Sequence, residues 1–91
     1  MQWLVSYDVT DDRRREKLAK ALLDYGQRVQ ESVFWLETED DLGDRIRDRL
    51  ARIISLGEDS LWIVPVCLAC VKKLEVIGIS PRPEVPEFYI F

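Results

Sequence analysis

Residues 3–15 read WLVSYDVTDDRRR and combine a strand pattern, a helix start and three consecutive arginines. Apolar and polar residues alternate over the first seven positions, which is typical of a half-buried β-strand. Trp3, Val5 and Tyr7 then share one face of the strand, and Asp8 lies on the other. The Thr-Asp-Asp that follows predicts a helix N-terminus, because short side-chain oxygens accept hydrogen bonds from its free N–H groups.

A carboxylate is therefore expected at the end of a strand, next to a run of guanidinium groups. This arrangement suits nucleic-acid chemistry, because a carboxylate can hold a metal ion and cations can hold phosphate. The alternative is that Asp8 is a turn residue and Arg13–Arg15 form a solvated helix face. Local patterns of this kind often occur by chance, so both readings stay open on the pattern alone.

The chain has 91 residues, of which 47% are hydrophobic, and it predicts one small folded domain. A domain of this size buries a modest core, so an oligomer is a reasonable expectation. No apolar run approaches the roughly 18 residues of a membrane span. Acidic residues interrupt the pattern of a signal peptide near the N-terminus. A cytoplasmic protein is the resulting expectation.

Charge and histidine content limit the chemistry. The net charge is −4, but the segment from Arg13 to Arg28 holds six basic residues against two acids, which predicts a basic patch on an acidic protein. The chain has no histidine. This excludes histidine-based acid–base catalysis and histidine-ligated metal sites, so a metal would need oxygen or thiolate ligands.

The remaining apolar spacing predicts a fold. The expected elements are a helix over 11–25 stopped by Gly26, strands at Gln27–Glu31 and Ser32–Glu37, a helix capped by Asp40 or Asp41 and stopped by Gly57, and a strand at Ser60–Val66. This order predicts the α+β class, as a ferredoxin-like βαββαβ sandwich with both helices on one face of an antiparallel sheet. The other face, which carries Asp8, is then free for a partner.

The C-terminal region extends beyond that sandwich. Prolines at 81, 83 and 86 favour an extended path, which leads to the apolar end Phe88–Phe91. We expect an additional C-terminal strand there, or an arm on a partner. The predicted organisation is a ferredoxin-like domain over 1–80 and a Pro-rich linker with its strand or arm over 81–91.

Two further groups allow several readings. Cys67 and Cys70 form a C-x-x-C pair whose readings are buried or turn thiols, a labile disulfide, or a metal shared between chains. The aromatic residues that could stack bases on the sheet are Tyr7, Phe34, Trp35 and Trp62. Packing in the core or in a dimer is the alternative for these rings.

Two longer blocks carry a family resemblance. Residues 7–15, YDVTDDRRR, and residues 25–34, YGQRVQESVF, resemble the two signature blocks of the CRISPR-associated protein two family. The similarity extends over the chain, including the entry to the last core strand at 58–61, the C-x-x-C pair and the Pro-rich tail. That family is the small adaptation nuclease that partners the CRISPR integrase.

The resemblance implies a ferredoxin-like homodimer in which Asp8 binds Mg²⁺ at the two-fold axis. Asp8, Tyr7 and Phe34 are then the expected catalytic residues. Together with the basic patch, the resemblance gives the expected nucleic-acid-binding residues, which are Arg13, Arg14, Arg15, Lys17 and Arg28.

The implied function is that of a Mg²⁺-dependent endonuclease or endoribonuclease in CRISPR adaptation, the acquisition of spacers. In this role the homodimer bridges integrase subunits and helps to hold the protospacer duplex. One alternative is a non-catalytic scaffold that binds duplex DNA. A further alternative, suggested by the fold alone, is a toxin-like ribonuclease. Duplex DNA and single-stranded RNA both stay open as substrates.

Overall fold

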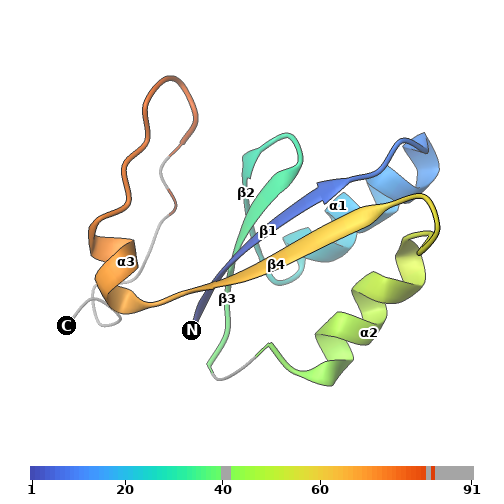
Figure 1. The fold of residues 1–91 in the computed structure, drawn as a ribbon, viewed down its shortest axis with the longest axis horizontal. Coiled ribbons are helices and arrows are strands. Elements are labelled where there is room, and N and C mark those ends of the chain that lie inside the picture. Colours follow the sequence, from blue (N-terminus) through green and yellow to red (C-terminus); the bar gives the residue numbers. More distant parts are fainter. Residues whose placement is uncertain (40–41, 82, 84–91) are drawn as a thin grey trace.

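The computed structural model describes residues 1–39, 42–81 and 83. Its elements are β1 (Gln2–Asp8), α1 (Asp12–Leu23), β2 (Gly26–Gln30), β3 (Val33–Glu37), α2 (Asp44–Ile53), β4 (Ser60–Val66) and α3 (Leu68–Lys72). The strands form one antiparallel sheet in the order β2-β3-β1-β4, and α1 and α2 lie on the same side of it (Figure 1). This arrangement confirms the predicted α+β sandwich. Within these ranges, no helix combines the length and the apolar character that crossing a membrane requires.

The alternation in β1 decides which face meets the helices. Trp3, Val5 and Tyr7 are each at most 5% exposed and belong to one core cluster with Leu18 of α1 and Leu50 of α2. Burial of these large apolar side chains is the main stabilising contribution of the sandwich. The opposite face of β1 ends in the exposed Asp8.

Helix α1 begins as predicted but ends earlier. The Asp11 carboxylate accepts a hydrogen bond from the Arg14 N–H at 2.9 Å and caps the helix. The helix ends at Leu23, and Asp24 is the C-cap. Gly26 is therefore not the helix stop but the first residue of β2. A Cβ at this position would lie 2.1 Å from the Trp35 carbonyl oxygen, so β2 can approach β3 here only because residue 26 is a glycine.

Strands β2 and β3 form a tight hairpin. Glu31 and Ser32 make the turn, and the register shifts between Arg28 and Gln30. Such an irregularity is typical of a β-bulge, which bends β2 just before the turn.

Helix α2 differs from its prediction at both ends. It begins at Asp44 after Gly43, whose φ of +81° suits a glycine, and the predicted caps Asp40 and Asp41 lie outside the described residues. Leu42 is buried just before the helix. The helix ends at Ile53 because Ile54 is already extended, so Gly57 does not stop it.

Strand β4 lies at the edge of the sheet next to β1, where Pro65 is tolerated because one side of the strand is unpaired in the described part of the chain. The five-residue helix α3 was not predicted. After it, residues 74–81 fold back toward the sheet, and the Ser80 hydroxyl donates a hydrogen bond to the Val29 carbonyl of β2. The open face is thus partly covered by the chain itself, which corrects the expectation of a wholly free face.

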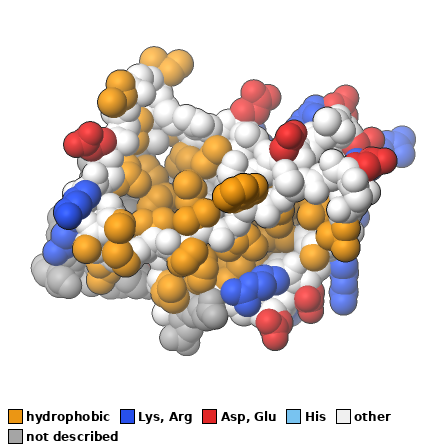
Figure 2. All heavy atoms as spheres, in the orientation of Figure 1, with side chains coloured by type: hydrophobic (Ala, Val, Ile, Leu, Met, Phe, Trp, Pro, Cys, Tyr) orange, Lys and Arg blue, Asp and Glu red, His pale blue; other side chains and the backbone are white. Residues whose placement is uncertain are grey.

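Hydrophobic side chains remain exposed beside this covered part. They gather over β4 and the C-terminal segment on the face seen in Figure 2. The exposed large apolar residues there include Trp62, Val64, Leu68, Ile77 and Ile79. The expected C-terminal strand at Phe88–Phe91 lies outside the described residues.

Candidate nucleic-acid and metal site

Asp8 ends β1 on the face of the sheet opposite α1 and α2. It lies opposite Ser60 of β4, and its side chain is exposed. Among the residues that the structure describes, none forms a hydrogen bond or an ion pair with the Asp8 carboxylate. Both oxygens are therefore available to a metal ion or to water.

The donor set fits a hard divalent cation only in part. Within 1–39, 42–81 and 83, no three histidine, cysteine or acidic residues cluster so that they could hold a metal ion. Mg²⁺ commonly takes one or two carboxylates and completes its shell with water and substrate phosphate. One chain supplies Asp8, so the residues fit Mg²⁺ if a second copy brings its own Asp8 to the site.

Tyr7 and Phe34 lie on the helix side of the sheet, away from Asp8. Tyr7 is 5% exposed and Phe34 is fully buried, and their rings stack with centroids 6.1 Å apart. The Tyr7 hydroxyl donates a 3.3 Å hydrogen bond to the Glu31 carbonyl. The three expected catalytic residues therefore do not share one face. The two rings are placed to position the strand that carries Asp8, and core packing is confirmed for them.

Arg28 and Arg15 come together on this helix side. The Arg28 guanidinium lies 5.1 Å from the centre of the Phe34 ring, a cation–π contact that leaves its N–H groups available to phosphate. Tyr7, Arg15 and Arg28 line one groove of about 470 Å³ beside α1. Lys20 lines it too and was not assigned to the site, although its spacing of i+7 from Arg13 places both on similar faces of the helix.

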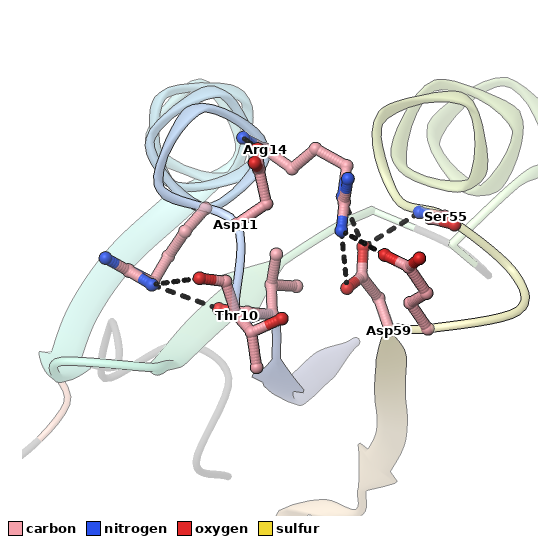
Figure 3. Close-up of polar contacts among 8 residues, drawn as sticks. Thr10, Asp11, Arg14, Ser55 and Asp59 are labelled. Atoms are coloured by element: carbon pink, nitrogen blue, oxygen red, sulfur yellow. Dashed lines mark hydrogen bonds and ion pairs between the residues drawn. The ribbon is translucent and has the colours of Figure 1, made fainter.

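Arg14 makes contacts within the chain. Its Nε donates to the Asp59 carboxylate at 2.8 Å, and Nη2 contacts Glu58 at 3.1 Å (Figure 3). Asp59 also accepts a 2.8 Å hydrogen bond from the Ser55 N–H. The Arg14 guanidinium and the Ser55 N–H hold the pKa of Asp59 below its usual range, and the Asp59 carboxylate raises the pKa of Arg14. Arg14 thus ties α1 to the turn before β4.

The other two arginines of the run differ from Arg14 and from each other. Arg15 donates to the backbone carbonyls of Val9 and Thr10 and pairs with Asp12, so it fixes the loop that follows Asp8. Arg13 and Lys17 are exposed, and neither has an ion-pair partner among the described residues. A phosphate backbone can therefore reach both charges.

A second basic groove lies between α1 and α2. It has a volume of about 730 Å³, and Arg49 in it is held by Asp24 at 2.8 Å and by the Tyr25 hydroxyl at 2.9 Å. Its other cationic lining residues are Lys17, Lys20, Arg45 and Arg52. On the surface of α2, Arg47 pairs with Asp44 at 3.7 Å.

Comparison with known proteins gives a consistent result. Residues 1–74 match the family model described as CRISPR associated protein Cas2. A protein of Thermus thermophilus named CRISPR-associated endonuclease Cas2 2 is 42% identical, over 97% of this chain and 93% of its own length. A protein of Chloroflexus aurantiacus named CRISPR-associated endoribonuclease Cas2 1 is 43% identical, over 96% of this chain and 95% of its own.

Solved structures agree with the fold. The crystal structure of Streptococcus pyogenes Cas2 superposes with a TM-score of 0.76 at 34% identity, and the match covers 86% of this chain and all of that one. A hypothetical protein from Thermus thermophilus has a TM-score of 0.78 at 42% identity, over 91% and 96% of the two chains. The sheet order, the two signature blocks and these matches together show that the chain belongs to the Cas2 family of CRISPR-associated proteins.

Proposed function

We propose that this protein is a Mg²⁺-dependent phosphodiesterase of CRISPR adaptation that acts as a homodimer. The observation that carries the proposal is the Asp8 carboxylate, which is exposed, unpartnered within the described chain and placed at the end of a rigid central strand. Its relatives are named endonucleases or endoribonucleases. Nucleic acid is therefore the substrate class that we assign to it.

The dimer supplies what one chain lacks. Two Asp8 carboxylates that face each other repel, and a divalent cation between them relieves that repulsion. A bound Mg²⁺ would polarise a phosphoryl oxygen and lower the pKa of a water molecule. The chain's own contribution is positional: β1 is paired on both sides, and the contacts of Arg15 with the Val9 and Thr10 carbonyls fix the loop next to Asp8.

Basic side chains hold the phosphate backbone in this proposal. Arg13 and Lys17 offer exposed charges on α1, and Arg15 and Arg28 line the groove beside it. In this proposal the dimer bridges the subunits of the CRISPR integrase.

An assay of metal-dependent cleavage tests the proposal. Wild-type protein and Asp8→Asn are incubated with labelled RNA and labelled duplex DNA, with and without Mg²⁺. We expect cleavage by the wild type only with Mg²⁺, and its loss in Asp8→Asn while sedimentation still shows a dimer. Asp44→Asn is the matched control, because Asp44 is an exposed carboxylate in another element and should leave cleavage unchanged. Full activity in Asp8→Asn would refute the catalytic role.

A non-catalytic scaffold is the second candidate. It is favoured by the absence, in the described parts of one chain, of any cluster of three metal-ligating residues. The cleavage assay also distinguishes the scaffold from the phosphodiesterase. A scaffold binds duplex DNA with and without Mg²⁺ and cleaves neither RNA nor DNA. Cleavage of RNA alone would identify RNA as the substrate.

A further inference from the structure

Two cysteines lie where β4 passes into α3, and the phosphodiesterase proposal gives them no role. Both Cys67 and Cys70 are free thiols with exposed side chains. Cys67 is the N-cap residue of α3, and Cys70 is the third residue of the helix. The pair is thus presented to solvent at a single helical turn.

The backbone of this turn already suits a disulfide. Residues 68 and 69 between them are helical, so helix geometry places the Cα atoms of the two cysteines about 5 Å apart. Disulfides bridge Cα atoms roughly 4.4–6.8 Å apart. The turn is closed by a 2.9 Å hydrogen bond from the Val71 N–H to the Cys67 carbonyl, and Val71 is buried. A bond between the two sulfurs therefore needs rotation of side chains rather than movement of the backbone.

A small reagent has room to reach Cys67. A cavity of about 250 Å³ borders this residue and is lined otherwise by Met1, Gln2, Val66 and Leu68. Attack by a thiolate on a disulfide needs an approach along the S–S axis, so open space next to the sulfur favours the reaction.

The two thiols are not equivalent. The N–H and the thiol of Cys70 hold the pKa of Cys67 below its usual range, whereas Cys67 raises the pKa of Cys70. Because the thiolate is the reactive form, Cys67 is the sulfur that attacks first.

We propose that Cys67 and Cys70 are a reversible dithiol–disulfide pair whose reaction partners are low-molecular-weight disulfides. The Cys67 thiolate attacks one sulfur of the reagent, forms a mixed disulfide and expels one thiolate. The Cys70 thiol then loses its proton and attacks the Cys67 sulfur, which forms the Cys67–Cys70 bond and expels the second thiolate. The protein loses two electrons and two protons, and one reagent disulfide becomes two thiols.

Oxidation would fix the first turn of α3, where the chain leaves β4 and begins its return toward the sheet. Residues 74–81 follow directly, and Ser80 joins them to Val29 of β2. The bond lies at the opposite end of β4 from Ser60, the residue paired with Asp8. The redox state of the pair is therefore expected to leave the Asp8 site unchanged.

Oxidised glutathione is the probe that tests this pair in the intact protein. In the wild type we expect both thiols to disappear, the mass to fall by two hydrogens and no glutathione to stay attached. Cys70→Ser should keep one glutathione on Cys67, because the resolving thiol is missing. Cys67→Ser should react more slowly than Cys70→Ser, because the backbone N–H of residue 70 still lowers the pKa of Cys67 in Cys70→Ser, whereas the Cys70 thiol has no such donor.

Three outcomes would overturn the proposal. They are a wild type that does not react, one that retains glutathione or forms disulfide-linked dimers, and single variants that react at equal rates. Circular dichroism of both serine variants controls for folding, since exposed thiols should tolerate the change.

Discussion

At the scale of single residues, three consecutive arginines have three different roles. Arg14 binds Asp59 and Glu58, Arg15 binds the loop after Asp8, and Arg13 is exposed. The sequence predicts the run and its position at the start of a helix. It could not distinguish the three, because the partner of Arg14 is 45 residues away and meets it only in the folded chain.

Asp59 should make stability depend on pH. Its side chain is inaccessible, and its pKa is lowered by Arg14 and by the Ser55 N–H. A carboxyl whose folded pKa is depressed stabilises the protein above its unfolded pKa of about 4, and this is lost as pH falls through the folded pKa. Asp59→Asn should lower the Tm by about 5 °C or more at neutral pH, with a smaller difference in acid. Thermal unfolding from pH 7 to pH 3 measures the difference in Tm between Asp59→Asn and the wild type.

Asp44→Asn is the matched control for that experiment. Asp44 is almost fully exposed and meets Arg47 at 3.7 Å, so it should change the Tm little at any pH. An Asp59 variant as stable as wild type at neutral pH would show that the pair with Arg14 contributes nothing.

A second prediction at this scale concerns the replacement of Gly26. Gly26→Ala brings a methyl group against the backbone of Trp35 and Leu36, with contacts of 2.1 Å and 2.8 Å that neither atom can relieve by rotation. The free energy of unfolding should fall by about 1–3 kcal/mol or more, as in overpacked cores. Gly57→Ala is the control, since nothing lies within 4 Å of its added methyl. Urea denaturation of both variants measures the difference, and equal stability would contradict the close approach.

At the scale of elements, α1 has two functions on two faces. Leu18, Ala21 and Leu22 pack into the core, while Arg13, Lys17 and Lys20 face solvent. The helical period predicts this division. It does not predict the two grooves beside the helix, both of which Lys20 lines, because each groove needs a second element, β2 in one case and α2 in the other.

The exposed cations of α1 should contact phosphate. The double variant Arg13→Gln, Lys17→Gln should weaken binding to duplex DNA of any sequence and reduce the slope of log affinity against log salt by about two. Lys72→Gln, Lys73→Gln removes the same charge at the far end of the molecule, by α3 (Figure 1), and should leave the slope nearly unchanged. Binding titrations at several salt concentrations measure both. Equal slopes in the two variants would show that the cations of α1 contact phosphate no more than those beside α3.

Predictability differed among elements for physical reasons. The bounds of β4, Ser60–Val66, follow from an apolar run between turn signals and are confirmed. The predicted end of α1 lies two residues beyond the observed one, Leu23, because Gly26 resembles a helix stop whereas its actual constraint is the backbone of β3. Helix α3 is not predicted because five residues are too few to show a helical period.

The placement of the candidate site residues was predictable in part. The separation of Asp8 from Tyr7 and Phe34 follows from strand alternation, but the resemblance groups the three as catalytic residues.

At the scale of the whole molecule, the two faces of the sheet differ. One is covered by α1 and α2, and the other is covered only in part by the segment at 74–81. Trp62 of β4 is 68% exposed, and Val64 on the same face is 39% exposed. Such a patch on a small protein marks an interaction surface, which the dimer of the proposed function would bury.

The dimer should therefore depend on β4. Trp62→Asp should convert the protein to a monomer, because a carboxylate buried without a partner in an apolar interface is strongly unfavourable. Leu56→Asp is the control, since Leu56 is 82% exposed in the turn after α2, away from this face. Sedimentation velocity of the two variants distinguishes them. A dimeric Trp62→Asp protein would place the interface elsewhere.

The metal content of the dimer tests the central claim most directly. Mn²⁺ replaces Mg²⁺ in oxygen sites, and its electron paramagnetic resonance signal reports how much is bound. Wild-type protein should bind one ion for every two chains in a class of sites that is missing from Asp8→Asn. Trp62→Asp should lose the same site although its Asp8 is intact. One ion per chain, or an unchanged site in Asp8→Asn, would contradict a metal centre built from two copies of Asp8.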